Sequence, residues 1–265
     1  MPARYPERIV CLTEETTETL YLLGEERRIV GISGYTVRPP RARREKPRVS
    51  AFLSAKNEKI LALEPDLVLG FSDLQADIVR DLAKAGLNVM LFNQRSVDEI
   101  LSMILTLSSL VGATAKGEAL VSTLEKNLQS VKETAKTFPK KPRVYFEEWD
   151  EPMISGIRWV SELIGIAGGE DVFPEKAVSP AATGRIVSSA AVIERRPEVI
   201  LGSWCGKKFR PEKVAARAGW NAIPAVQKEM IFEIKSADIL QPGPAALTDG
   251  VRRIQEILAA SFGHP

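Results

Sequence analysis

Carboxylates and aromatic rings are the side chains with which this sequence could do chemistry. Two acidic runs are conspicuous, Glu14-Glu15 near the N-terminus and Glu147–Glu151 in the second half. Two carboxyl groups that face each other at a defined separation can hydrolyse a glycosidic bond. The sequence does not set that separation, so we favour a second interpretation, in which these groups hydrogen-bond amide or amine donors of a bound ligand. An enzyme that uses the acidic turns stays open as an alternative.

Other kinds of catalytic centre find little support. The chain has one histidine, His264, beside the C-terminal Pro265, whereas Ser-His-Asp mechanisms and most zinc sites need histidine at the centre. Cys11 and Cys205 lie far apart and match no metal-binding spacing. No GxxxxGK[ST] loop is present to hold a nucleotide. We therefore predict that the protein is not an enzyme and needs no cofactor or metal of its own. The sequence leaves open whether Cys205 or His264 contacts a metal within a ligand.

Aromatic and polar residues follow the predicted strands of an α/β pattern. Ligands of parallel α/β sheets bind beyond the carboxyl ends of the strands, so the loops at these ends are the ones that can form a site. Here they combine aromatic walls with a few polar groups, which is the composition of a small-molecule cleft. The residues concerned are Glu14, Glu15, Tyr35, Phe52, Phe71, Glu148, Trp149, Asp150, Trp204 and Cys205.

Short apolar strands alternate with helices in the first hundred residues. Such alternation indicates parallel strands that are covered by helices. Strands are predicted at 8–12, 28–31, 67–69 and 89–92, and helices at 17–23, 57–63 and 74–85. The order recurs after Pro142, where RIVCLTEETTETLYLLG is echoed by RVYFEEWDEPMISGIRWVSELIGIAGG, LEPDLVLGF by ERRPEVILGSW, and NVMLF by EMIFE. This internal echo predicts two lobes of similar construction.

A long helical pattern separates the two halves. It runs from Val97 to about Phe138 with few breakers beyond Gly112 and Gly117. Its second part, of about 25 residues, corresponds to a helix of roughly 37 Å, which fits a rigid connection between lobes. An ordinary surface helix is the alternative. We predict the α/β class with two Rossmann-like lobes that have parallel-sheet cores, residues 1–112 and 139–265, a single linking helix over 113–138, and a ligand cleft between the lobes.

The overall composition is typical of a soluble globular protein with little net charge. Of 265 residues, 45% are hydrophobic and 26% are charged, and the net charge is only +2. Neither nucleic acid nor an anionic membrane is therefore an expected partner. No apolar stretch of about 18 residues is present, so no membrane span is predicted. The basic run Arg38–Arg48 predicts an exposed loop that serves partner docking or solubility.

The N-terminal residues and the cysteines bear on the compartment. Met1–Pro6 is short and polar and lacks the basic start and apolar run of a secretory signal. Cys11 and Cys205 are predicted to be free, buried thiols, which favours a reducing compartment. As it stands, the sequence predicts the cytoplasm, and the periplasm is the alternative if a signal has been removed.

Taken in order, several phrases resemble a known family. RIVCLTEETTETLYLLG, SGYTVRPP, LALEPDLVLGF, WVSELIGIAGGEDVF and QPGPAALTDGV, with the long helix between them, look like the substrate-binding proteins of ABC importers. The similarity is to the type whose two lobes are joined by one long helix, and within it to the cobalamin and iron-siderophore group, with vitamin B12-binding proteins closest. It covers about Arg8 to Leu258. The resemblance implies a ligand between the lobes, an ABC permease as partner and a monomeric protein.

The resemblance also implies which residues touch the ligand. They are Glu14, Glu15, Thr16, Thr17, Tyr35, Phe52, Phe71, Glu148, Trp149, Asp150, Pro152, Trp204, Gln241, Pro242 and Gly243. We add Cys205, which follows Trp204 in the same predicted loop. Asp77 and Glu212 match the acidic residues with which family members dock onto the permease.

Departures from the family pattern narrow the expected ligand. Phe52 and Phe71 take the positions of two cleft tryptophans of the cobalamin group. Anionic siderophores usually meet arginines, whereas the turns here are acidic, which favours a neutral or cationic ligand. Aromatic walls suit a corrinoid, which is large, flat-faced and rich in amides. We expect non-catalytic binding of a corrinoid for uptake or intracellular handling, with an iron-siderophore or another metal complex as the alternative.

Overall fold

The chain folds into two compact units. The computed structural model describes residues 5–52 and 54–262. Unit 1 comprises the residues up to Gln94 and Asp98–Thr123, and unit 2 comprises Arg95–Val97 and the residues from Leu124 onward. Helix α6 (Thr114–Ala135) begins in unit 1 and ends in unit 2.

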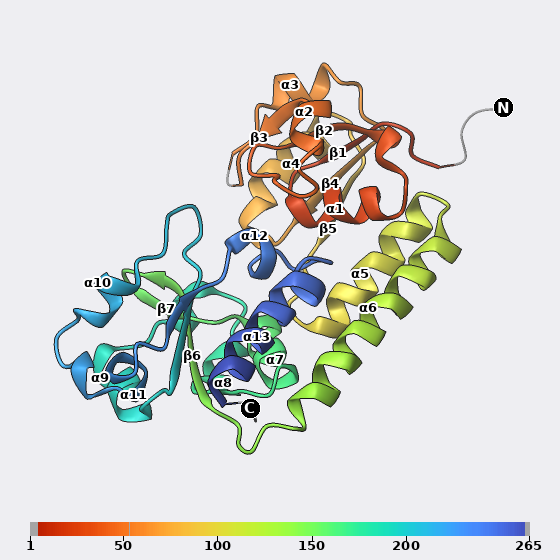
Figure 1. Ribbon diagram of the computed structural model, residues 1–265. Helices are drawn as coiled ribbons and strands as arrows, with labels where there is room; N and C mark the ends of the chain where they lie inside the picture. Colours follow the sequence, from red (N-terminus) through yellow and green to blue (C-terminus); the bar gives the residue numbers. More distant parts are fainter. Residues whose placement is uncertain (1–4, 53, 263–265) are drawn as a thin grey trace. The chain divides into compact units, whose positions relative to one another are not determined.

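Unit 1 is built on a parallel sheet with the strand order β3-β2-β1-β4-β5 (Figure 1). Its strands are β1 (Ile9–Cys11), β2 (Ile29–Ser33), β3 (Arg48–Ser50), β4 (Leu67–Phe71) and β5 (Val89–Phe92). Its helices are α1 (Glu14–Leu22), η1 (Glu26–Arg28), α2 (Ala42–Glu45), α3 (Asn57–Leu61), η2 (Asp73–Gln75), α4 (Ala76–Lys84), α5 (Val97–Leu110) and the first half of α6.

The core of unit 1 joins the central strands to the helices that cover them. Val10 of β1 and Val68 of β4 are fully buried, and they pack with Ile60 of α3 and Leu82 of α4 in one cluster. A strand covered on both faces is apolar nearly throughout, which explains the unbroken runs IVC and LVLGF. The predicted parallel sheet with covering helices is confirmed.

The basic run Arg38–Arg48 is not the exposed loop that we expected. It contains helix α2, whose Ala42 is fully buried, and its last residue begins β3. Arg38 contacts Glu18 at 2.8 Å, and the guanidinium of Arg41 lies 4.7 Å from the centre of the Tyr21 ring. These contacts attach the segment to α1, so several of its charges serve packing within unit 1.

The long helical pattern corresponds to two helices. α5 ends at Leu110, and Gly112 takes a positive φ of 71° that turns the chain before α6 begins. Gly117 lies within α6 and does not interrupt it. Its lack of a side chain leaves room for Ser108 of α5, where the two helices approach closely. The predicted linking helix, 113–138, begins at this break, and the apolar spacing is helical on both sides of it. Among the described residues, no helix has both the length and the apolar content needed to cross a membrane.

Unit 2 is built on a sheet with the strand order β10-β9-β6-β7. The short strand β8 pairs in parallel with the first two residues of β6, Arg143 and Val144. Its strands are β6 (Arg143–Asp150), β7 (Met153–Ser155), β8 (Glu170–Asp171), β9 (Val199–Gly202) and β10 (Ile231–Glu233). Its helices are the end of α6, α7 (Arg158–Ile166), α8 (Pro174–Ala177), η3 (Ala182–Arg185), α9 (Ser189–Arg195), α10 (Pro211–Ala215), η4 (Trp220–Ala222), α11 (Pro224–Gln227), α12 (Ser236–Ile239), η5 (Ala246–Gly250) and α13 (Val251–Phe262).

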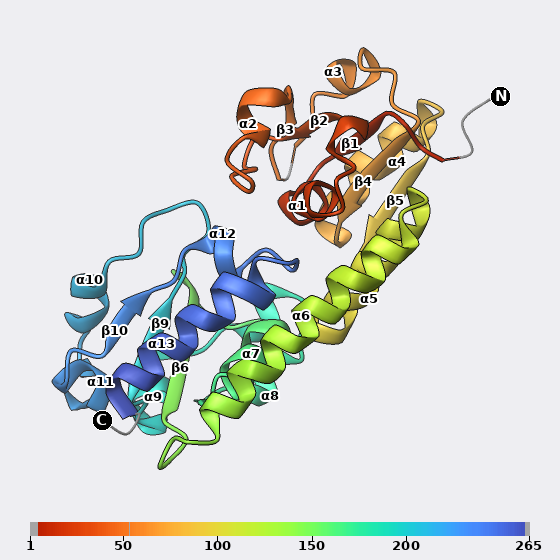
Figure 2. The same cartoon turned by 45° about the vertical axis from the view of Figure 1, so that its right-hand side comes forward.

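Helices cover both faces of the unit 2 sheet (Figure 2). On one face, Val144 of β6 lies beside Ile164 of α7 and Leu258 of α13, where all three surround Gly169. On the other face, Tyr145 belongs to a buried cluster with residues of α9, α10 and η4. Successive residues of β6 therefore point to opposite layers, as the pleat of a strand requires.

The internal echo in the sequence is matched by the topology. β1 pairs with β4 and β4 with β5, and in the same way β6 pairs with β9 and β9 with β10, all in parallel. The echoed phrases PDLVLG and PEVILG are β4 and β9, and a glycine near the end of each strand admits a side chain from the loop that follows. Gly70 gives room to Gln75, and Gly202 gives room to the ring of Phe209.

Two predicted loops are regular structure instead. The acidic turn predicted at Thr13–Thr16 is the first turn of α1, which begins at Glu14. Residues Glu147–Asp150 belong to β6, which is longer than expected. Only Glu151 and Pro152 separate β6 from β7, and so short a connection can join only antiparallel strands. The sheet of unit 2 is therefore parallel with one antiparallel edge.

Gly202→Ala should destabilise the protein by about 1–3 kcal/mol, because the new methyl group overlaps the ring of Phe209. Gly165→Ala in α7 is the matched control, since no atom lies within 4 Å of the added Cβ, and we expect it to stabilise by up to about 1 kcal/mol. Urea unfolding of both variants measures the difference. Equal effects of the two substitutions would contradict the close packing of Phe209 on Gly202.

Candidate functional site

The first turn of α1 brings four of the predicted ligand residues together in unit 1. Glu14, Glu15, Thr16 and Thr17 are all buried, and Glu15 is only 1% exposed. The hydroxyls of Thr16 and Thr17 donate to the carbonyl of Thr13 at 3.2 and 3.3 Å, within the first turn of the helix. The turn is therefore a rigid part of the fold at the carboxyl end of β1.

The carboxyl group of Glu15 is held in an environment that favours its neutral form. Burial raises its pKa to about 8, although the hydroxyl of Thr13, which donates to Oε1 at 2.6 Å, acts in the opposite direction. Its Oε2 atom is buried and has no hydrogen-bond partner in the described structure. Burial also raises the pKa of Glu14. At neutral pH Glu15 is thus mainly a carboxylic acid, which can donate as well as accept, and not the anion that the sequence suggests.

The aromatic residues predicted for unit 1 differ in exposure. Tyr35 is 54% exposed, Phe52 is half-buried, and Phe71 at the end of β4 is 7% exposed. Gln75 links the last two, because its Oε1 accepts from the backbone N–H of Phe71 at 3.0 Å and its Nε2 donates to the carbonyl of Phe52 at 2.9 Å. Sequence reasoning missed Gln75, since only the folded chain places it across the end of β4. Asp77 lies in the first turn of α4 with its side chain 84% exposed, 2.6 Å from Arg80.

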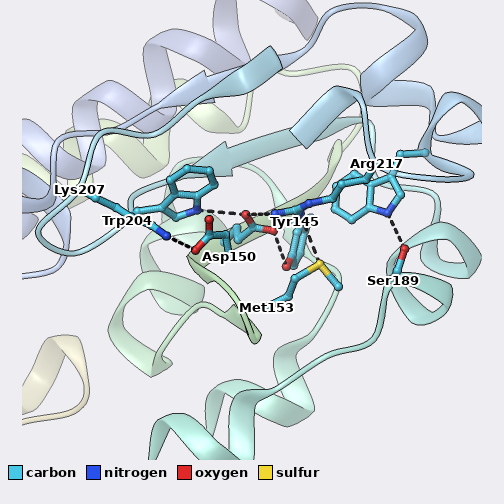
Figure 3. A network of polar contacts seen from close by, with 9 residues as sticks. Tyr145, Asp150, Met153, Ser189, Trp204, Lys207 and Arg217 are labelled. Carbon is cyan, nitrogen blue, oxygen red and sulfur yellow. Dashed lines mark hydrogen bonds and ion pairs between the residues drawn. The ribbon is translucent and has the colours of Figure 1, made fainter. Parts of the chain in front are cut away.

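In unit 2 the centre of the site region is Glu147, which is fully buried. It lies on the same face of β6 as Tyr145 and Trp149, two residues away on either side. Arg217 contacts it through both terminal nitrogens, at 2.5 and 2.9 Å, and Trp204 donates its indole N–H at 3.0 Å (Figure 3). The hydroxyl of Tyr145 donates at 3.1 Å. Both oxygens of this buried carboxylate are therefore satisfied by donors from three segments of the chain.

Glu147 was not among the predicted ligand residues, and the sequence did contain a signal for it. Tyr145, Glu147 and Trp149 alternate as the residues on one face of a strand do. The acidic run was interpreted as a loop, and that interpretation hid the alternation. Arg217 follows α10 and carried no comparable signal. Its guanidinium also lies 4.6 Å from the centre of the Trp220 ring and 3.3 Å from the sulfur of Met153.

Glu148 points away from this group and pairs with Arg185. The guanidinium of Arg185 is 3% exposed and contacts both carboxylate oxygens, at 2.5 and 3.0 Å, while Nη1 also donates to the carbonyl of Ser155 at 2.6 Å. Two contacts to a nearly buried guanidinium fix the position of this carboxylate. Arg185, at the end of η3, is a further residue that the sequence did not indicate.

Trp149, Asp150 and Trp204 come together around the side chain of Lys207. The ammonium group of Lys207 lies 4.1 Å from the ring centre of Trp149 and 5.0 Å from that of Trp204. It also forms an ion pair with Asp150 (Figure 3). Three predicted ligand residues thus share one intramolecular partner, which lies in the loop after β9.

The remaining predicted residues lie at several positions on unit 2. Pro152 is exposed in the β6–β7 turn, and Gln241 is half-buried ahead of the buried Pro242 and Gly243. Glu212 is 68% exposed in the first turn of α10 and lies 3.6 Å from Arg210. The docking role that the resemblance implies for Glu212 and for Asp77 stays a prediction.

The cysteines differ from each other in exposure. Cys11 in β1 is a free thiol and is buried as predicted, and burial raises the pKa of this thiol to about 12. Cys205 is exposed, so its predicted burial is wrong. It follows Trp204 in the loop after β9, where the chain turns outward before Phe209 packs back onto Gly202. His264 lies outside the described residues. Among the described residues, no group of three or more His, Cys, Asp and Glu is placed to hold a metal ion.

Comparison with known proteins identifies the family. The family model described as periplasmic binding protein matches residues 9–237. The chain belongs to this family. A vitamin B12-binding protein of Vibrio parahaemolyticus is 28% identical over 245 residues, which are 91% of this chain and 86% of the relative. An uncharacterized ABC transporter substrate-binding lipoprotein of Bacillus subtilis is 25% identical over 261 residues, which are 95% of this chain and 79% of the relative.

A solved structure shows that the fold is shared beyond these relatives. The periplasmic heme-binding protein RhuT from Roseiflexus sp. RS-1, in its apo form, superimposes with a TM-score of 0.81 at 23% identity, covering 95% of this chain and 98% of that one. The resemblance inferred from the ordered sequence phrases is thereby confirmed at the level of the family, and so are the two α/β lobes. The family is one of binding proteins.

Arg217→Met should destabilise the protein by about 3–5 kcal/mol, because it leaves the buried carboxylate of Glu147 without its cation. The double variant Glu147→Gln, Arg217→Met should recover a large part of this loss. Arg253→Met is the control, since it removes an exposed ion pair with Glu256 and should cost less than about 1 kcal/mol. Urea unfolding measures the stability of all three variants. A double variant no more stable than Arg217→Met would argue against an unpaired buried carboxylate at Glu147 as the cause of the loss.

Glu15→Gln should stabilise the protein at alkaline pH but not at acid pH. The folded-state pKa of about 8 lies above the ordinary 4.5, so the folded chain binds this proton more tightly than the unfolded chain. The stability that this gives is complete below pH 4.5 and is lost as the pH rises through 8, whereas the variant escapes that loss. Unfolding free energies of variant and wild type, measured from pH 4 to pH 9, should therefore diverge by several kcal/mol.

Glu26→Gln serves as the control with the opposite sign. Its own backbone N–H holds the pKa of Glu26 below the ordinary value, with Arg41 acting in the same direction, so the variant should lose a little stability above pH 4.5. If Glu15→Gln changes stability equally at pH 4 and pH 9, Glu15 is not protonated in the folded chain.

Proposed function

We propose that the chain binds a flat metal complex without transforming it, and that its solute is a corrinoid such as cobalamin. The observation that carries the proposal is the pair of anchored indoles at the carboxyl ends of β6 and β9. Trp149 donates its N–H to the carbonyl of Glu151 at 2.9 Å, and Trp204 donates to Glu147 at 3.0 Å. A ring held at its polar edge, like that of the half-buried Trp149, offers rigid apolar surface to a large ligand at little entropic cost. Trp204 is 4% exposed and belongs to the buried core of unit 2.

The charge balance around these rings favours a solute without strong negative charge. Three carboxylates of β6 are each matched by one cation, namely Glu147 by Arg217, Glu148 by Arg185 and Asp150 by Lys207. Heme propionates and catecholate siderophores are anionic and call for cations that are not already paired. A corrinoid instead presents amide groups, which hydrogen-bond to neutral or paired partners. These ion pairs therefore support a corrinoid over heme or a catecholate complex.

The relatives support the same class of solute and a role in uptake. One is named a vitamin B12-binding protein, another an ABC transporter substrate-binding lipoprotein, and the RhuT structure is that of a periplasmic heme-binding protein. We propose accordingly that the partner is an ABC permease and that the protein acts outside the cytoplasm. That location replaces the cytoplasm, which the polar N-terminus and the cysteines had suggested.

Titration with cyanocobalamin should show saturable 1:1 binding by calorimetry and by the visible absorbance of the corrin. Hemin and a ferric hydroxamate, titrated in the same way, should bind at least tenfold more weakly. If hemin or the hydroxamate binds and cobalamin does not, the corrinoid assignment is wrong while binding of a metal complex stands. If none of the three binds, the proposed function itself is wrong.

Substitution of one ring tests the observation that carries the proposal. Trp149→Ala removes an anchored apolar wall and should weaken cobalamin binding about tenfold or more, which corresponds to about 1.4 kcal/mol. Val178→Ala, at an exposed position of the same unit, is the matched control and should leave affinity unchanged. Unaltered affinity in Trp149→Ala, with the fold intact by circular dichroism, would remove the main support.

A further inference from the structure

The cations of the three β6 ion pairs differ in exposure and in the number of other contacts they make. The side chain of Arg185 is 3% exposed and that of Arg217 is 20% exposed, and each guanidinium makes several hydrogen bonds. Lys207 is different, because its side chain is 39% exposed and belongs to a loop in which Gly206 has a positive φ of 78°. Withdrawing Lys207 therefore breaks one partly exposed ion pair and two contacts with indole rings, and it leaves the hydrogen bonds of Glu147 and Glu148 intact.

The groups that surround the Lys207 ammonium form a receptor for a cation. Two indole faces lie within 5.0 Å of it, and Asp150 supplies a carboxylate. Aromatic faces attract organic cations through their electron-rich surfaces, and the attraction is greatest for weakly hydrated groups such as quaternary ammonium ions. We define Trp149, Asp150 and Trp204 as the cation cage.

The cage does not depend on Lys207 for its shape. The indole N–H groups of both tryptophans are engaged elsewhere, with Glu151 and Glu147. Phe209 packs edge-on against Trp204, with the ring centres 4.9 Å apart. The walls thus stay in place when the lysine leaves, and removal of its positive charge leaves Asp150 beside the rings of Trp149 and Trp204; Figure 3 shows Lys207 between Trp204 and Asp150.

We propose that the cation cage is a binding site for a positively charged organic group, and that Lys207 occupies it when no such group is bound. The ligand's cation displaces the ammonium of Lys207, which moves into solvent with its loop, and the charge around Asp150 stays balanced. This goes beyond the proposed function, because the group bound in the cage is defined by its positive charge and need not belong to a corrinoid. A quaternary or alkylated ammonium group meets the condition, whether it is free or part of a larger solute.

The test compares choline with its uncharged isostere 3,3-dimethylbutan-1-ol. In Lys207→Ala the cage is vacant, so choline should bind at least tenfold more tightly than to the wild-type chain and at least tenfold more tightly than the isostere. Asp150→Asn in the same background should reduce this preference several-fold. Binding is followed by the indole N–H resonances of Trp149 and Trp204, assigned with single Trp→Phe variants, which also report that the fold is intact.

Lys208→Ala is the matched control, because it removes the same charge from the same loop without emptying the cage. It should bind choline like the wild-type chain. The proposal is overturned if Lys207→Ala binds choline no more tightly than Lys208→Ala, or if choline and the isostere bind alike. These outcomes are independent of cobalamin binding by the wild-type chain, so failure of the cage and failure of the proposed function are told apart.

Discussion

The buried carboxylate of Glu147 is the constraint on which the arrangement of unit 2 depends. A charge without exposed surface is tolerated only where donors and a counter-charge surround it. Its donors are Tyr145 of the same strand, Trp204 after β9 and Arg217 after α10, so satisfying it draws two separate segments over one face of β6. The indole of Trp204 is fixed in consequence, and it provides part of the surface on which Lys207 rests.

The two units bury a glutamate in different ways. In unit 2 the charge is kept and matched, because Arg217 lies against both oxygens of Glu147. In unit 1 the neutral form of the carboxyl group is favoured, because burial raises the pKa of Glu15 to about 8. The donor to this group is the neutral hydroxyl of Thr13. Glu15 follows the first strand of unit 1 and Glu147 lies within the first strand of unit 2, so the repeated topology does not impose one electrostatic solution. The candidate ligand residues of the two units therefore differ in charge state.

Much of the fold could be read from the sequence, because its signals are local. The phrases PDLVLG and PEVILG correspond to strands with a glycine at or near the end, at corresponding places of the two sheets, and the order of the echoed segments is the order of strand pairing. Boundaries were less well predicted. A boundary was expected after Gly112, where the chain does turn before α6, but the Glu147–Asp150 segment was taken for a loop because its acidic composition outweighed its alternation.

By itself, the sequence determined the α/β class, the doubled order of elements and the family, and it placed Trp149, Asp150 and Trp204 among the candidate ligand residues. The tertiary structure decided what those residues touch and which charges persist. Glu147 and Arg217 are 70 positions apart, and Asp150 and Lys207 are 57 apart, so no local pattern could pair them. Burial is decided in the same way, because exposure and pKa depend on what the rest of the chain packs against a residue and not on the residues beside it in sequence.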